Sequence, residues 1–215
     1  MSLSLRGLTI SLPAAPLVQP FDLDIPDGEI VTLMGASGVG KSSLLAFIAG
    51  DLPPPLQGSG LIHIDGEDVS ILAPERRRIG RLFQDDLLFP HLTVAENLLF
   101  GMARGPQAQR LARMQEALAA AGLEGFVDRP PHTLSGGQRA RVSVLRSLLA
   151  EPRAMLLDEP FNKLDMALRR AFRDFVFEQL LARATPTLMV THDRSDAPPG
   201  GRVLAIGVDG TVRDD

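Results

Sequence analysis

Short apolar segments and segments with helical spacing alternate along most of this chain. Four segments are short and rich in aliphatic residues, as expected for buried strands, and they span 29–34, 79–84, 154–158 and 187–191. A helical segment follows the first of them at 42–49, where Gly50 is a C-terminal stop, and another fills about 166–183. Strands that alternate with helices predict a largely parallel sheet covered on both faces.

The two ends of the chain show a different pattern. Residues 1–34 alternate strand pieces with turns at Pro13–Pro16 and Pro26–Gly28, and 61–69 combine a strand with a hairpin turn. The segment 202–213 is predicted to form another hairpin. We therefore expect a small antiparallel β part near the N-terminus, beside the main sheet.

Between residues 87 and 134 the pattern is mainly helical. Leu111, Met114, Leu118 and Ala121 recur at the spacing of one helix face. We therefore predict an α/β fold in one domain over 1–215. Its core comprises 1–86 and 139–215, and a helical subdomain is inserted at 87–138.

Composition excludes several classes of function. The chain has no cysteine, so disulfides, thiol chemistry and cysteine-ligated metals are excluded. Its formal net charge of −4 argues against a dedicated nucleic-acid binder. No apolar run approaches the ~20 residues that a membrane helix needs, and the N-terminus lacks the layout of a signal peptide. If the protein works at a membrane, another chain is expected to supply the membrane part.

The strongest motif is a glycine-rich loop directly after the strand 29–34. It matches the phosphate-binding pattern G-x-x-x-x-G-K-[ST] and comprises Gly35, Ala36, Ser37, Gly38, Val39, Gly40, Lys41, Ser42 and Ser43. The glycines let backbone N–H groups approach phosphate oxygens, and a helix N-terminus faces the same anions. Lys41 is predicted to reach the outer phosphates, and Ser42 to offer its hydroxyl to Mg²⁺. The core is therefore predicted to be a nucleotide-binding core of the P-loop NTPase type.

Two carboxylates end the apolar strand 154–158, at the sheet edge where ligands bind in α/β folds. Asp158 is predicted to hold Mg²⁺ through water. Glu159 could accept a proton from an attacking water. An acidic strand end caught in a turn is the structural alternative, and the neighbouring phosphate loop favours the functional one.

A second glycine-rich helix start precedes the helical run Arg139–Ala150, and it comprises Leu134, Ser135, Gly136, Gly137 and Gln138. Ser135 is a natural N-cap, and the two glycines leave the first N–H groups of the helix open to an anion. A capped helix with a flexible entry would need no function at all. The loop 35–43 and the segment 134–138 are thus two anion sites, or cradles, although a nucleotide has one terminal phosphate. Either the two sites bind different anions, or two chains share one nucleotide.

Two further polar residues are expected near the same sheet edge. Gln84 closes the strand 79–84 and is either a polar group near the metal and water or a simple strand-end amide. His192 follows the strand 187–191, and this position favours a functional histidine. By contrast, the run Arg76–Arg78 is predicted to form a solvated turn.

One competing motif is Asn162–Asp165, which matches the N-K-x-D pattern that reads guanine in small GTPases. In those proteins the motif lies on a loop late in the chain, after a different strand from the one that carries the metal-binding carboxylate. Here it closely follows Glu159. No D-x-x-G sequence occurs in the chain. We interpret the match as a coincidence.

The complete ordered set resembles the ATP-binding subunit of ABC transporters, and it consists of the loop 35–43, Gln84, the segment 134–138, Asp158, Glu159, Asp165 and His192. Leu-Ser-Gly-Gly-Gln at 134–138 is the signature of that family. The segment 83–94 also resembles the importer-type region that meets the membrane partner. The resemblance covers essentially the whole chain.

The resemblance implies a Mg²⁺-dependent ATPase that powers an importer. Two such subunits stack head to tail, and each ATP lies between the loop 35–43 of one and residues 135–137 of the other. The implied partners are a second copy of the chain, transmembrane permease subunits and a substrate-binding protein, without nucleic acid. The implied location is the cytoplasmic face of the membrane, with a subunit that is soluble when isolated.

The resemblance also implies a role for each remaining residue. Asp158, with Ser42 and Gln84, positions the metal, Glu159 is the general base, and His192 orients the γ-phosphate and the water. Gln84 relays the nucleotide state to the permease. Asp165 carries contact across the dimer.

The chain departs from the family pattern where the adenine of ATP is bound. It contains no Tyr and no Trp, and Leu12 and Pro13 stand where the family stacks adenine on an aromatic ring. Asn162 and Lys163 stand where the family more commonly has Ser-Ala.

Three other functions are alternatives to a transporter ATPase. They are a non-transport ABC ATPase acting on DNA or ribosomes, a P-loop GTPase or kinase, and an ATP switch that binds without turnover.

Overall fold

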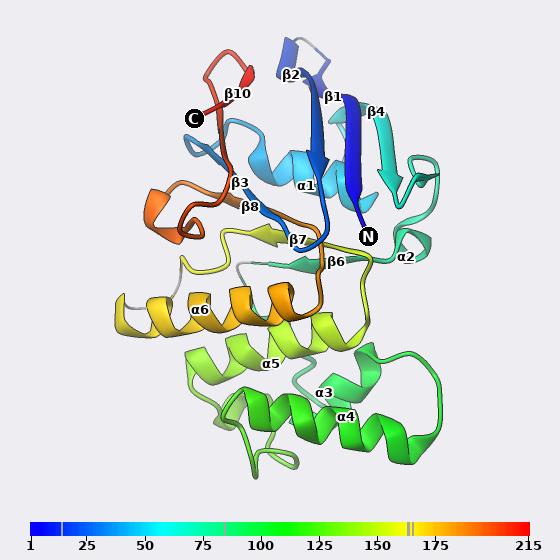
Figure 1. Ribbon diagram of the computed structural model, residues 1–215, viewed down its shortest axis with the longest axis vertical. Coiled ribbons are helices and arrows are strands. Elements are labelled where there is room, and N and C mark those ends of the chain that lie inside the picture. The colour runs from blue at the N-terminus through cyan, green and yellow to red at the C-terminus, as the bar shows by residue number, and fades with distance from the viewer. Residues whose placement is uncertain (14, 84, 163, 165) are drawn as a thin grey trace.

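The main sheet of the computed structural model has six strands in the order β10-β9-β3-β8-β7-β6 (Figure 1). The structure describes residues 1–13, 15–83, 85–162, 164 and 166–215. The strands are β3 (Ile30–Gly35), β6 (Ile79–Leu82), β7 (Ala154–Asp158), β8 (Thr187–Thr191), β9 (Val203–Ile206) and β10 (Val212–Asp214). All neighbours pair in parallel except β10 with β9, which form the terminal hairpin. The predicted, largely parallel sheet is confirmed.

A smaller antiparallel sheet has the order β2-β1-β4-β5. Its strands are β1 (Leu3–Leu12), β2 (Ala15–Ile25), β4 (Gln57–Ile64) and β5 (Glu67–Asp68). The helix α1 (Lys41–Ala49) lies between the two sheets (Figure 1). Leu44, Leu45 and Ile48 of α1 are fully buried in one cluster with residues of both sheets. Burial of these apolar side chains fixes the helix, and with it the loop from which the helix begins.

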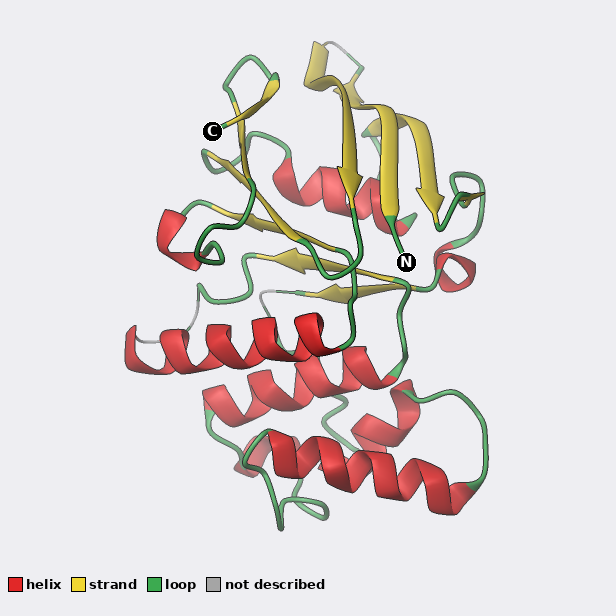
Figure 2. Ribbon diagram, in the orientation of Figure 1, coloured by secondary structure: helices red, strands yellow, loops and turns green. Residues whose placement is uncertain are grey.

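The four other long helices lie on the opposite side of the main sheet (Figure 2). They are α3 (Val94–Gly101), α4 (Gln107–Ala120), α5 (Gly136–Leu149) and α6 (Met166–Ala182). Three shorter helical turns occur elsewhere in the chain order: α2 (Pro74–Arg77), η1 (Pro131–Thr133) and η2 (Arg194–Asp196). Within the described residues, no helix has the length and apolar character that would let it cross a bilayer. The predicted helical stretch is confirmed, and α5 begins three residues earlier than the predicted run at Arg139.

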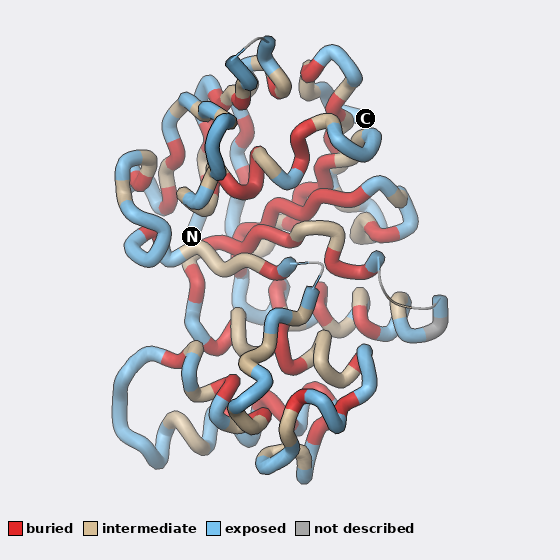
Figure 3. Tube along the Cα trace, turned by 180° about the vertical axis from the view of Figure 1, so that it is seen from behind, coloured by how far each residue is buried: buried red, intermediate tan, exposed pale blue. Residues whose placement is uncertain are grey.

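Helix α5 joins the helical part to the main sheet because it is apolar on two faces. Val144 and Leu148 pack in a cluster with β6, β7 and α6, whereas Val142 and Leu145 pack in a cluster with α3 and α4. Seen from behind, the buried positions follow the central strands and continue into these helices (Figure 3). The subdomain boundary proposed at residue 138 therefore falls inside a helix that both clusters share.

The prediction of a solvated turn is wrong for Arg77. This residue is buried, and its guanidinium donates hydrogen bonds to the carbonyl oxygens of Phe47, Ile48, Ser70 and Leu72. The carbonyls of a helix C-terminus lack partners within the helix, so a cation there is favourable. Arg77 thus caps α1 from outside.

Candidate functional site

The phosphate loop runs from the end of β3 to the start of α1, and its glycines adopt conformations that other residues avoid. Gly38 has φ 81° and Gly40 has φ 105°, both in the left-handed region. A Cβ on Gly40 would lie 2.8 Å from Cγ of Leu17, so glycine is also required by space. Gly40 is the N-cap of α1 and offers no side-chain acceptor, which leaves the first N–H groups of the helix available to an anion.

Lys41 is buried and folds back over this loop. Its Nζ donates hydrogen bonds to the carbonyl oxygens of Gly35 at 2.7 Å and Ala36 at 2.9 Å. Burial lowers the pKa of Lys41, and the nearby carboxylates of Glu159 and Asp158 oppose that shift. The ammonium group is therefore held at the loop with its charge incompletely compensated, which suits it to an anionic ligand.

Ser42, in the first turn of α1, contacts Asp158, the last residue of β7. The hydroxyl of Ser42 donates to Oδ1 of Asp158 at 2.8 Å. One hydroxyl and one carboxylate are hard oxygen donors of the kind that Mg²⁺ takes. Among the described residues, no three His, Cys, Asp or Glu side chains gather as a metal cage. The pair therefore fits a Mg²⁺ ion that takes its other ligands from water and phosphate.

Glu159 is the next residue and sits in strained backbone, with φ 45°. Its N–H donates to the carbonyl oxygen of Val190 at 3.0 Å. Its carboxylate accepts a hydrogen bond from Asn162, and Nδ1 of His192 lies 3.4 Å from Oε1. Because these contacts define the position of the carboxylate, Glu159 is held at the edge of the loop.

Glu159 and the loop line one cavity of about 180 Å³, together with Leu17, Ser37, Gly38, Gly40, Lys41, Ser42 and Ser43. Ala36 lies instead in a shallow depression with Gly35 and His192. Leu17 comes from β2 and brings an aliphatic side chain to the loop. Leu12, where an aromatic residue was expected from the family pattern, is exposed at the end of β1.

The second glycine-rich segment caps α5 as predicted. The Ser135 hydroxyl accepts from the N–H of Gln138 at 3.3 Å, and the Gln138 side chain accepts from the N–H of Ser135 at 2.9 Å. This capping box leaves the N–H groups of Gly136 and Gly137 at the helix start. Leu134 is buried among the helices and anchors the segment from the other side.

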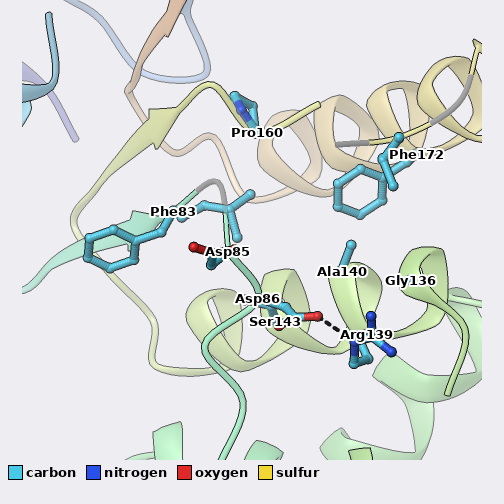
Figure 4. Close-up of a pocket in the computed structure, with 11 residues that line it drawn as sticks. Phe83, Asp85, Asp86, Gly136, Arg139, Ala140, Ser143, Pro160 and Phe172 are labelled. Carbon is cyan, nitrogen blue, oxygen red and sulfur yellow. Dashed lines mark hydrogen bonds and ion pairs between the residues drawn. The ribbon is translucent and has the colours of Figure 1, made fainter. Parts of the chain in front are cut away.

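This helix start does not share the cavity of the phosphate loop. Gly136 lines a different cavity of about 310 Å³ between β6, α5 and α6 (Figure 4). Asp86 and Arg139 form a 2.7 Å ion pair at its wall, and Phe83 and Phe172 supply apolar surface. Within the described part of one chain, the two predicted anion cradles are therefore separate.

Two predicted site residues, Gln84 and Asp165, lie outside the described residues. Two other residues of the site were missed by the sequence argument. Asn162, which the sequence singled out only as a departure from the family pattern, contacts Glu159. Arg81 forms an ion pair with Asp158, and its sequence signal was a charged residue within an otherwise apolar strand, which must find a partner when buried.

Comparisons with known proteins agree with the family that the ordered motifs predicted. A family model described as ABC transporter matches residues 18–162. The ABC transporter ATP-binding protein YnjD of Escherichia coli (strain K12), described as uncharacterized, is 43% identical over 94% of this chain and 94% of its own length. The Fe(3+) ions import ATP-binding protein FbpC of the same strain is 42% identical over 90% of this chain, which spans only 55% of that protein.

A third relative is the thiamine import ATP-binding protein ThiQ of Photobacterium profundum, with 44% identity over 84% of this chain and 75% of that protein. Among solved structures, cbiO1 of Clostridium perfringens, part of the ABC transporter complex cbiONQ, superposes with a TM-score of 0.84. It is 28% identical and the match covers 98% of this chain and 86% of that one. The resemblance predicted from the ordered motifs is thereby confirmed, and the chain belongs to the ABC transporter family as an ATP-binding, ATP-hydrolysing subunit.

Proposed function

We propose that the chain works as a homodimer that closes around ATP and hydrolyses it to power import through a permease. The observation that carries the proposal is the separation of the two glycine-rich helix starts, which line different cavities of one chain. A second copy placed head to tail would bring its residues 135–137 to the loop 35–43 of the first. Each nucleotide would then be held by both copies.

On the loop side, Lys41 and the N–H groups at the start of α1 bind the phosphates. Lys41 exchanges its two carbonyl acceptors for phosphate oxygens when ATP arrives. Ser42 and Asp158 would hold Mg²⁺, which when bound neutralises charge on the phosphates. Most of the catalytic effect is then electrostatic positioning by groups fixed before the reaction.

Glu159 is the proposed general base. Its carboxylate lines the loop cavity, where it can accept a proton from water attacking the terminal phosphorus. Asn162 and His192 contact the two oxygens of that carboxylate and keep it oriented. His192 lies at the carboxyl end of β8 and is proposed to orient both the γ-phosphate and the water. The roles of Gln84 and Asp165 remain those predicted from the sequence.

On the partner side, Ser135 and the helix start of α5 supply the second cradle. The dipole of α5 adds partial positive charge at its N-terminus, where the γ-phosphate of the other copy's ATP would lie. ATP then links two surfaces that attract each other weakly without it. Hydrolysis removes the link and reopens the dimer.

The cavity beside α5 is the proposed contact with the permease. It lies where the nucleotide-binding core (1–86 and 139–215) meets the helical subdomain (87–138). Movement of one part relative to the other would therefore change the shape of this cavity. Two of the relatives are named as import proteins, one for Fe(3+) ions and one for thiamine, which supports import. The subunit would thus work peripherally at the cytoplasmic face of the membrane, with a substrate-binding protein on the other side.

Two experiments test the proposal. The first replaces Glu159 by Gln and measures mass in solution by size exclusion with light scattering. With MgATP, a dimer is expected for this variant, and persistent monomer would contradict the shared-nucleotide arrangement. A matched variant with Ser135→Ala in addition should remain monomeric.

The second experiment isolates the tagged protein from membranes and identifies what is recovered with it. A polytopic membrane protein supports the transporter, whereas recovery of ribosomes or DNA favours the non-transport alternative.

A further inference from the structure

Arg81 of β6 bridges two carboxylates beside the phosphate loop. Its Nη1 lies 3.1 Å from both oxygens of Asp51, and its Nη2 lies 3.2 Å from Oδ2 of Asp158. The guanidinium also lies over the ring of Phe83, with 4.4 Å from Cζ to the ring centre. A charged side chain held by two anions and a ring in the interior has one position, because each contact restricts it.

The bridge reaches the proposed metal ligand directly. The side chains of Arg81 and Asp158 are 13% and 14% exposed, so solvent screens their interaction much less than it screens a surface pair. The two oxygens of Asp158 already have separate partners, since Oδ1 accepts from Ser42 and Oδ2 from Arg81. A cation that approaches Asp158 therefore shares its carboxylate with a guanidinium.

Asp51 moderates this competition. It follows α1 and is exposed on one side, with a side-chain exposure of 46%. With Arg81 in place, the three groups Asp51, Arg81 and Asp158 carry one net negative charge. Without Arg81 they would carry two, and without the charge of Asp51 they would carry none.

We infer that Arg81 is a positioning residue that sets the affinity of the nucleotide site for its divalent cation. It acts through Asp158, as a competing cation whose strength Asp51 controls. The inference rests on the proposed function, because it takes Ser42 and Asp158 as the Mg²⁺ ligands. A purely structural strut between β6 and the end of α1 is the alternative, and charge changes separate the two.

The two mechanisms predict different signs for the loss of Arg81. If Arg81 competes with the metal, Arg81→Met makes the site more negative and tightens cation binding. Asp51→Asn then releases the guanidinium from its other partner, so that it holds Asp158 more strongly and weakens cation binding. If Arg81 is only a strut, both variants lose the same bridge and both weaken the site.

The test measures Mn²⁺ binding by electron paramagnetic resonance, with the whole chain and saturating adenylyl imidodiphosphate, a non-hydrolysable ATP analogue. We expect the dissociation constant for Mn²⁺ to fall roughly three- to tenfold in Arg81→Met and to rise by a similar factor in Asp51→Asn. Arg81→Lys, which keeps the charge, should stay near the wild-type value. Weaker Mn²⁺ binding by Arg81→Met, with an intact thermal transition, would overturn the inference.

Failure of the proposed function gives a different result. If wild-type protein binds no Mn²⁺ with the analogue beyond that bound by the analogue alone, or if Ser42→Ala leaves Mn²⁺ binding unchanged, the metal site itself is wrong. If wild-type binding depends on Ser42 and only the Arg81 and Asp51 variants deviate from their expected signs, the metal site stands and the role of Arg81 fails. Should Arg81→Met not fold, Arg81→Gln takes its place, because it also removes the charge, and Mn²⁺ binding weaker than wild type in that variant contradicts competition.

Discussion

Nδ1 of His192 lies 3.4 Å from Oε1 of Glu159, although 33 positions separate the two residues in the chain. They follow the carboxyl ends of two neighbouring parallel strands, β7 and β8. Parallel pairing brings such ends to one edge of the sheet. The contact places the proposed base and its orienting group together at that edge.

Replacing Glu159 by Gln should leave ATP binding intact and reduce turnover by at least about a hundredfold, since the amide cannot accept the proton from water. The measurement is phosphate release alongside nucleotide affinity. His192→Ala should also lower turnover while Glu159 remains in place. If phosphate release by Glu159→Gln were undiminished, Glu159 would not be the base.

The cap of α5 should matter for more than stability. Ser135→Ala removes one half of a capping box, and Thr93→Ala removes the equivalent half at the start of α3. Each should cost about 1 kcal/mol in the free energy of unfolding. Only Ser135→Ala should also weaken ATP-driven dimerisation. Equal loss of dimer in both variants, measured by light scattering in the Glu159→Gln background, would count against a specific role for Ser135.

Arg77 should contribute strongly to stability even though it lies far along the chain from the helix that it caps. Arg77→Ala removes the guanidinium from carbonyls of α1 and of the segment that follows β5, and we expect a loss of about 3 kcal/mol in urea unfolding. The neighbouring Arg76 is exposed, so Arg76→Ala is the matched control and should change little. Similar losses in both variants would argue against the buried cap.

The depressed pKa of Lys41 predicts how ATP binding depends on pH. Burial favours the neutral amine in the free protein, whereas a bound triphosphate favours the ammonium. ATP affinity is therefore fully present below the lowered pKa and falls as the pH rises through it, with proton uptake on binding in that range. Isothermal titration in two buffers of different ionisation enthalpy measures this uptake.

The control for that titration is Lys41→Arg, because a guanidinium keeps its proton throughout the range. This variant should bind ATP without the uptake, whatever its affinity. The same proton uptake in both proteins would assign the titration to another group.

Short stretches of sequence were enough to identify the family, the phosphate loop and the strand ends that carry the site. These features are local: a glycine-rich turn needs particular residues in a row, and a buried strand needs a short apolar run that delivers its last side chains to a known edge. Ser135 was predicted as an N-cap for the same reason, since a cap involves only residues within one helical turn.

The charged side chains that partner the site could be identified only from the folded structure. Arg77 belongs to a run of three arginines of which it alone is buried, and two of its acceptors come from α1. Arg81 reaches Asp158 because β6 pairs with β7, a pairing between segments more than 70 residues apart. Such contacts depend on strand order and helix placement, which are set by burial summed over the whole molecule and not by any neighbouring residues.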